Sequence, residues 1–202
     1  MFDAKLRPLI DRPLDKIARL LTGTPVTANM VTFIGFIFGV CAAVAILFEA
    51  YLMSLSFILI NRIFDGLDGA IARQKGTTDY GGYLDILLDF IFYNMIPAAF
   101  IVTHSDKNAV AGVFLMLSFV GTGVSFLAYA ILAEKRKVTT ELRGKKSFYY
   151  LGGLTEGTET IILFILLCLF PQHFPIFAFC FGALCWVTTL FRVYSAYLTF
   201  KE

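Results

Sequence analysis

The sequence contains few charged residues for its length. Only 16% of its 202 residues are Asp, Glu, Lys or Arg, whereas 58% are hydrophobic and the mean hydropathy is +0.76. A soluble domain of this size would leave far too much apolar surface in contact with water. The charges also cluster between long apolar runs, as expected when a hydrocarbon layer of about 30 Å excludes charge. We therefore predict an integral membrane protein.

Cysteine is scarce, and its placement excludes two further classes. The four cysteines lie in apolar stretches and show neither CxxC nor Cys/His metal spacing: Cys41, Cys168, Cys180 and Cys185. We predict neither a disulfide framework nor a zinc site and interpret them as packing residues. No short apolar core with a small-residue cleavage site precedes the first apolar run, so we expect no signal peptide to be removed. The sequence also shows no second folded domain or low-complexity linker.

The apolar runs predict an all-α polytopic fold. Residues 2–22 mix apolar and basic residues, a pattern typical of a helix lying in the headgroup region. Each later run is close to the roughly 20 residues that a helix needs to cross a membrane. We expect residues 1–26 to form a juxtamembrane amphipathic segment and residues 27–202 a six-helix transmembrane domain, with spans near 28–48, 51–73, 82–103, 109–133, 149–170 and 174–198.

Basic residues are concentrated in alternate connections, which predicts the orientation. They occupy the N-terminal segment, the 73–81 turn and the 134–148 loop, whereas the other turns hold only Lys107. By the positive-inside rule, both termini and these basic segments face the cytoplasm. The 134–148 loop is better interpreted as an orientation signal and anionic-lipid contact than as a catalytic element.

Four aspartates stand inside two of the predicted spans, on either side of one cytoplasmic turn: Asp65, Asp68, Asp85 and Asp89. An Asp at a helix centre costs about 2.5–3.5 kcal/mol on the mild insertion scale, so four imply a cation or a water-filled cavity. The i,i+3 and i,i+4 spacings place each pair on one helix face, within roughly 5–12 Å of the cytoplasmic boundary. Two such faces can converge where a cytosolic nucleotide reaches them.

Paired carboxylates supply the hard oxygen ligands that Mg²⁺ or Mn²⁺ prefers, and a carboxylate-held metal pair suits in-line displacement at a diphosphate. Two alternatives stay open. A single Asp at a helix end can simply reach the interface, and carboxylate clusters also serve proton or ion relays in transporters.

The aspartate pattern resembles the signature of the CDP-alcohol phosphotransferases. It reads Asp65-x2-Asp68-Gly69-x2-Ala72-Arg73, then Gly81-x3-Asp85-x3-Asp89. The six-span layout with an N-terminal interfacial helix is similar to the family throughout. The resemblance implies transfer of a phosphatidyl or other alcohol-phosphate group from a CDP-linked lipid, such as CDP-diacylglycerol, to an acceptor alcohol, with release of CMP.

The resemblance also implies roles for the motif residues. Asp65, Asp68 and Asp85 would hold two Mg²⁺ or Mn²⁺ ions, and Asp89 would share the site and deprotonate the acceptor hydroxyl. The CDP pocket would be shaped by Gly69, Ala72, Arg73 and Gly81. It also implies a homodimer. We further expect a bacterial inner membrane protein whose active site faces the cytoplasm, and no nucleic-acid partner.

The first span departs from the family, which often opens it with Thr-Pro-Asn. Here the residues are Thr27-Ala28-Asn29. Ordinary helix capping by Thr27 and Asn29 is favoured over nucleotide contact. Further along, Gly35-x3-Gly39 permits close helix contact, either within the chain or between subunits.

Three residues of the later spans are candidates for the acceptor pocket. Glu156 and Glu159 are expected roughly 10–15 Å inside the fifth span, where they would favour a polyol or amine, or else pair with Arg62 or Arg192. Arg192 itself would bind an acceptor phosphate or snorkel to the interface.

Two other functions remain as alternatives. An intramembrane prenyl-diphosphate transferase also uses metal-bound aspartates, but it needs two separated motifs and usually more spans. A carboxylate-based transporter would need repeats or broken helices, which we do not recognise. The identity of the acceptor alcohol does not follow from the sequence.

Overall fold

The computed structural model describes residues 3–137 and 154–201, with side chains from residue 11 onward. Within these residues the chain is helical and contains no strand, so the predicted all-α class is confirmed. The helices are α1 (Asp3–Leu21), α2 (Ala28–Leu47), α3 (Tyr51–Lys75), α4 (Asp79–Thr103), α5 (Ser105–Lys135), α6 (Gly157–Leu169), the short 3-10 helix η2 (Pro171–His173) and α7 (Phe174–Phe200).

Among the described residues, four helical runs are long and apolar enough to cross a membrane. They are α2, α4, α5 and Pro171–Phe200. Helix α3 has 25 residues but carries polar and charged side chains through its second half. Helix α6 has only 13 residues, about 20 Å of helix, which is shorter than a hydrocarbon layer of about 30 Å.

The predicted fifth span, 149–170, does not form one continuous helix over the described residues 154–170. Residues 149–153 of that prediction lie outside the described residues, as does most of the 134–148 loop. Residues 154–156 are not helical, and α6 begins at Gly157. The physical reason is local, because Glu156 caps the helix at this position.

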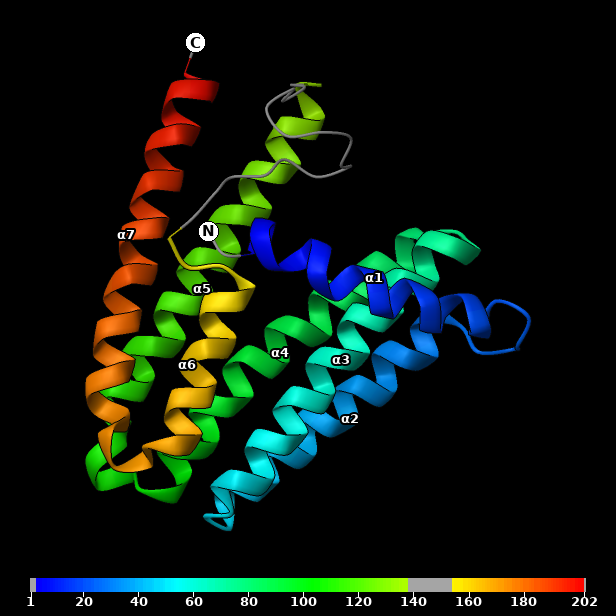
Figure 1. Ribbon diagram of the computed structural model, residues 1–202. Helices are drawn as coiled ribbons and strands as arrows, with labels where there is room; N and C mark the ends of the chain where they lie inside the picture. The colour runs from blue at the N-terminus through cyan, green and yellow to red at the C-terminus, as the bar shows by residue number, and fades with distance from the viewer. Residues whose placement is uncertain (1–2, 138–153, 202) are drawn as a thin grey trace.

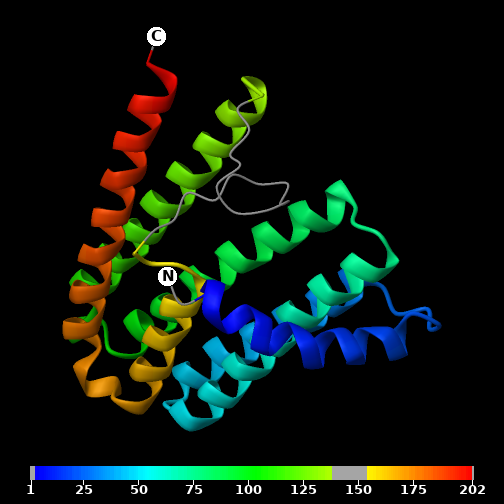
Figure 2. The same ribbon diagram turned by 45° about the horizontal axis from the view of Figure 1, so that its top comes forward.

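The helices form two packed groups joined by α4 (Figures 1 and 2). Helices α5 and α7 run side by side, α2 pairs with α3, and α4 contacts both α2 and α5. Aromatic rings fill the junction: Phe92 of α4 meets Phe164 of α6 edge to face at 5.8 Å, and Phe100 stacks on Phe174 at 5.0 Å. Such fully buried rings contribute most of the apolar burial at a junction of this kind.

Helix α2 approaches its neighbours closely at Gly35 and Gly39. A Cβ added to Gly35 would lie 2.9 Å from Phe64 Cβ of α3, and one on Gly39 would lie 2.8 Å from Phe92 Cδ2 of α4. The small-residue spacing thus serves packing within one chain, which settles the alternative left open by the sequence.

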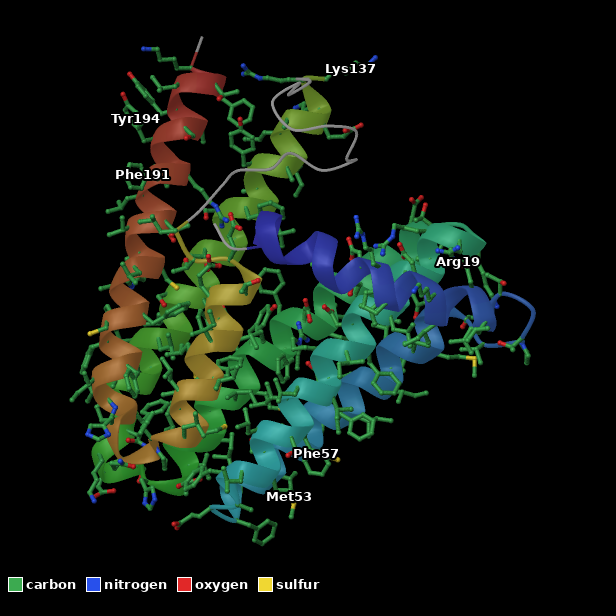
Figure 3. All side chains as sticks on the ribbon, viewed as in Figure 1. Arg19, Met53, Phe57, Lys137, Phe191 and Tyr194 are labelled. Atoms are coloured by element: carbon green, nitrogen blue, oxygen red, sulfur yellow. The ribbon has the colours of Figure 1, made fainter. Side chains whose placement is uncertain are left out.

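The outer faces of the helices are apolar. Met53 of α3 and Phe191 and Tyr194 of α7 point away from the bundle in Figure 3, and Phe191 is 60% exposed. Apolar outward faces together with apolar helices of this length are those of an integral membrane protein.

Candidate active site

The aspartates of α3 and α4 converge on one recess. Helix α3 ends at Lys75 and α4 begins at Asp79, so each pair lies a few turns from the same connection. The recess is lined by all four carboxylates together with side chains of α2 and α3: Thr32, Gly35, Phe36, Asn61, Arg62, Asp65, Asp68, Asp85, Leu88 and Asp89. Both α3 and α4 pack against α2, and this shared neighbour brings the four carboxylates to one recess.

Arg62 occupies the middle of this acidic group. Its Nη2 donates to Asp89 Oδ1 of α4 at 2.8 Å, and its Nη1 lies 3.5 Å from Asp65 Oδ2 of α3. Its Nε donates to Asn61 Oδ1 at 2.7 Å, and the guanidinium carbon lies 4.7 Å from the centre of the Phe92 ring. The guanidinium is therefore held from several sides.

The donor set fits a divalent cation. Asp68 is 5% exposed, and its Oδ2 is buried with no hydrogen-bond partner among the described residues. A buried carboxylate oxygen without a partner carries a large desolvation cost, which a bound cation would offset. The recess measures about 10 Å³, which is room for about one water molecule or ion.

Among the described residues, the carboxylates are not arranged around a common metal-binding point. Within residues 3–137 and 154–201, no three acidic, imidazole or thiol groups are gathered as they would be around a metal ion. Asp65 and Asp89 instead both form ion pairs with Arg62.

A larger cavity of about 470 Å³ adjoins the recess and shares Thr32, Asp68 and Asp85 with it. It lies between α2, α3 and the start of α4, and includes three of the residues expected at the CDP moiety, Gly69, Ala72 and Gly81. Lys75 also lines it, while its Nζ donates to the Thr24 and Val26 carbonyls at 2.7 and 2.8 Å. This volume suits a nucleotide-sized ligand.

Arg73, the fourth residue expected there, does not line that cavity. It faces α1 instead, with Nη2 3.1 Å from Asp15 Oδ1 and 3.6 Å from Asp11 Oδ1. The neighbouring Gln74 donates to the Asp15 carbonyl at 3.0 Å. In this structure Arg73 therefore joins α1 to the end of α3.

The start of α2 both caps its helix and lines the nucleotide-sized cavity. Thr27 is the N-cap residue and accepts from Met30 N at 3.3 Å, as favoured from the sequence. Asn29 Oδ1 would lie only 3.0 Å from a Cβ added to Gly81, and Thr78 Oγ1 would lie 2.9 Å from it. A side chain at position 81 would therefore crowd Thr78, the N-cap residue of α4, and Asn29 of α2 at the cavity wall.

A second cavity of about 270 Å³ lies between α4, α5, α6 and α7. Glu156 and Arg192 line it along with Phe90, Tyr93, Phe119, Thr122, Gly123, Phe126, Thr155, Gly157 and Thr160. Arg192 is buried and donates to the Thr122 carbonyl at 2.7 Å, so the snorkelling alternative is wrong. Tyr93 links this cavity to the recess, because Arg62 Nη1 donates to its hydroxyl at 3.3 Å.

The two glutamates lie at the start of α6, not deep inside a span. Glu156 and Glu159 form a capping box, in which Glu159 Oε2 accepts from Glu156 N at 3.1 Å. Glu159 does not line the second cavity, so its geometry indicates a cap. Glu156 does line it. Arg62, the other proposed partner of the glutamates, is instead bonded to Asp65 and Asp89.

Sequence reasoning missed the place of Arg62 in the acidic recess. One signal was present, because Arg62 stands three residues before Asp65 and therefore on the same helix face. The contact with Asp89 had no such signal, since it joins side chains 27 positions apart on different helices.

Comparison with known proteins agrees with the sequence resemblance. Residues 25–194 match the family described as CDP-alcohol phosphatidyltransferase. The chain is 51% identical over its whole length to inner membrane protein YnjF of Escherichia coli, covering 98% of that protein. It is 27% identical to archaetidylinositol phosphate synthase of Pyrococcus horikoshii, over 96% of this chain and 95% of that protein.

Solved structures share the fold. Phosphatidylinositol phosphate synthase PgsA1 of Mycobacterium tuberculosis, crystallised with CDP-DAG bound, superposes with a TM-score of 0.73 at 21% identity, over 92% of this chain and 94% of that chain. The same protein in complex with manganese and citrate gives a TM-score of 0.71 at 22% identity, over 91% and 88%. The family match favours the transferase over the prenyl-diphosphate transferase and the transporter, and this chain belongs to the CDP-alcohol phosphatidyltransferase family.

Proposed function

We propose that this member of a phospholipid-synthesising transferase family moves a phosphatidyl group from CDP-diacylglycerol, or a related CDP-alcohol, to a small hydroxylated acceptor. One observation carries the proposal. The recess lined by four aspartates opens onto a nucleotide-sized cavity, with Asp68 and Asp85 belonging to both. A diphosphate whose nucleoside lay in the cavity would present its phosphorus atoms to the carboxylates.

The proposed reaction forms one bond and breaks one. The acceptor oxygen attacks the lipid-side phosphorus, the bond from that phosphorus to CMP breaks, and CMP leaves with the electron pair. Asp89 takes the proton of the acceptor hydroxyl, since an aliphatic hydroxyl is a weak nucleophile without a base in reach. Asp65, Asp68 and Asp85 would hold two Mg²⁺ or Mn²⁺ ions with Asp89 alongside, and these ions would neutralise the diphosphate charge.

The acceptor would enter through the second cavity. Arg192 and Glu156 offer opposite charges on its walls, and Tyr93 connects it to the side of the recess that holds Asp89. A guanidinium suits an acceptor phosphate, and a carboxylate suits polyol hydroxyls or an amine. We therefore propose an acceptor that carries an anionic group beside several hydroxyls, with Glu159 supporting Glu156 as a helix cap.

Six spans, with α3 and α6 completing the count, would place both termini and the recess on the cytoplasmic side of an inner membrane. Residues 1–26 would form the juxtamembrane segment and residues 27–202 the catalytic domain, in a homodimer. We propose that Arg73 serves the CDP pocket indirectly, by fixing α1 against α3 beside Gly69.

The test is a substrate panel with purified protein in detergent. CDP-diacylglycerol, Mg²⁺ or Mn²⁺ and a set of alcohols and phosphorylated alcohols would be incubated together, with CMP and lipid products measured by mass spectrometry. We expect metal-dependent CMP release with an anionic polyol and a raised KM for that acceptor in Arg192→Gln. Equal use of anionic and uncharged acceptors by the wild type, or an unchanged KM for the anionic acceptor in Arg192→Gln, would contradict the acceptor proposal.

A further inference from the structure

Arg62 lies against two of the carboxylates that would bind metal in the acidic recess. Its side chain is 16% exposed, and its two terminal nitrogens reach carboxylates on different helices, Asp65 on α3 and Asp89 on α4. These are two of the four aspartates that line the recess. Arg62 therefore acts electrostatically as a cation already present in the site.

The surroundings hold the guanidinium in this place. Nε donates to Asn61 Oδ1, whose own Nδ2 donates to the Gly35 carbonyl at 2.8 Å. The guanidinium carbon lies 4.7 and 5.5 Å from the ring centres of Phe92 and Tyr93. The Arg62 guanidinium packs on two aromatic rings and donates to an amide, a hydroxyl and a carboxylate oxygen, so its position is pre-organised.

Without a cation, the four carboxylates of the recess would repel one another in a partly buried setting. Arg62 reduces that repulsion, and its contacts occupy carboxylate oxygens that a divalent ion would use. The recess then leaves room for about one ion, at about 10 Å³. Release of Arg62 from Asp65 and Asp89 would open it.

We propose that Arg62 is an internal counter-ion that competes with divalent metal for Asp65 and Asp89 and so lowers the metal affinity of the site. The inference rests on the metal site of the proposed function. On metal binding, the guanidinium leaves the two carboxylates while staying on the Phe92 and Tyr93 rings, which places it between the recess and the second cavity. Arg62 is thus a positioning residue, not a catalytic one.

The first test is Mn²⁺ binding without substrate, by titration calorimetry or electron paramagnetic resonance. Even at the dielectric constant of water, a single positive charge about 5 Å from a divalent ion weakens its binding on the order of tenfold. We expect Arg62→Gln to bind Mn²⁺ at least about tenfold more tightly than the wild type. The control Lys107→Gln removes an exposed positive charge elsewhere and should leave the affinity unchanged.

An equal or weaker affinity in folded Arg62→Gln would overturn the proposal. Wild-type protein that binds no Mn²⁺ at all would instead refute the metal site itself, so the two failures are distinguishable.

A second measurement covers the case in which Arg62→Gln does not fold. Infrared difference spectra of arginine-labelled protein, with and without Mn²⁺, report on changes at guanidinium groups. We expect a band change in the wild type that is missing in Arg62→Lys, which keeps the charge. A wild-type spectrum without a guanidinium change would show that Arg62 keeps its carboxylate contacts, contrary to the proposal.

Discussion

At the scale of single residues, Asp68 is the aspartate most deeply placed in the site. It is 5% exposed, belongs to both the recess and the nucleotide-sized cavity, and has a buried Oδ2 without a hydrogen-bond partner among the described residues. A buried carboxylate oxygen without a hydrogen-bond partner is better suited to binding a cation than to holding the fold together.

We predict that Asp68→Asn weakens Mn²⁺ binding at least roughly tenfold, because changes outside the ligand shell alone cost about 10–100-fold. Calorimetric titration of the purified variant measures this. The exposed Asp106→Asn serves as the matched control, since it makes the same chemical change far along the chain. Unchanged Mn²⁺ affinity in Asp68→Asn would remove Asp68 from the ligand set.

Gly81 lies where the first turn of α4 comes close to Asn29 of α2. An alanine Cβ there would lie 2.9 Å from Thr78 Oγ1 and 3.0 Å from Asn29 Oδ1, whereas one on Gly82 meets nothing within 4 Å. We expect Gly81→Ala to destabilise the protein by about 1–3 kcal/mol and to raise the KM for the CDP-lipid. Thermal unfolding should separate it from Gly82→Ala, and equal melting temperatures would argue against close contact of α2 and α4.

At the scale of elements, helix α1 is joined to α3 by polar contacts at one end and apolar ones along its length. Leu14 and Ala18 are buried against Ala70 and Ile71, and Arg73 bonds to Asp15. Figures 1 and 2 both show α1 crossing α3. The apolar contacts carry most of the stability, since the ion pair is between half-exposed groups.

We predict that Arg73→Gln and the double variant Asp11→Asn/Asp15→Asn have the same effect, because each removes one side of the same set of ion pairs. Global stability should fall by less than about 1 kcal/mol, while proteolysis of the segment before residue 27 becomes faster. If Arg73→Gln impairs CDP-lipid binding and the double variant does not, Arg73 contacts the nucleotide directly.

Helix positions were largely predictable, whereas the contacts between helices were not. Apolar run length placed α2, α3, α4 and α7 within a few residues, and the turn after Lys75 put the aspartate pairs near each other. The Arg62–Asp89 and Arg73–Asp15 pairs depend on how distant helices pack, which no local pattern encodes. The start of α6 at Gly157 was missed because the predicted span included residues 154–156, which are not helical and lead into the Glu156 cap.

At the scale of the whole molecule, the proposed six-span topology determines which connections between helices face the cytoplasm. Lys107 lies at the start of α5, and the nucleotide-sized cavity lies at the connection between α3 and α4. With six spans, Lys107 and that connection would face opposite sides of the membrane.

Reporter fusions test this topology. A fluorescent protein at the C-terminus should fluoresce in the cytoplasm, and alkaline phosphatase inserted at Lys107 should be active outside it. The reverse pattern, with phosphatase active at the C-terminus, would mean that the cavity faces away from cytosolic nucleotides.

The central claim is that the aspartate recess transfers a phosphatidyl group with Asp89 as the base. The most direct measurement is the rate of CMP release from CDP-diacylglycerol, with Mn²⁺ and the acceptor found in the panel, for the wild type, Asp89→Asn and the control Asp106→Asn. General-base catalysis contributes about 10²–10⁴-fold, so we expect that loss in Asp89→Asn and a wild-type rate in the control. An Asp89→Asn protein that is folded and releases CMP at the wild-type rate would contradict the account.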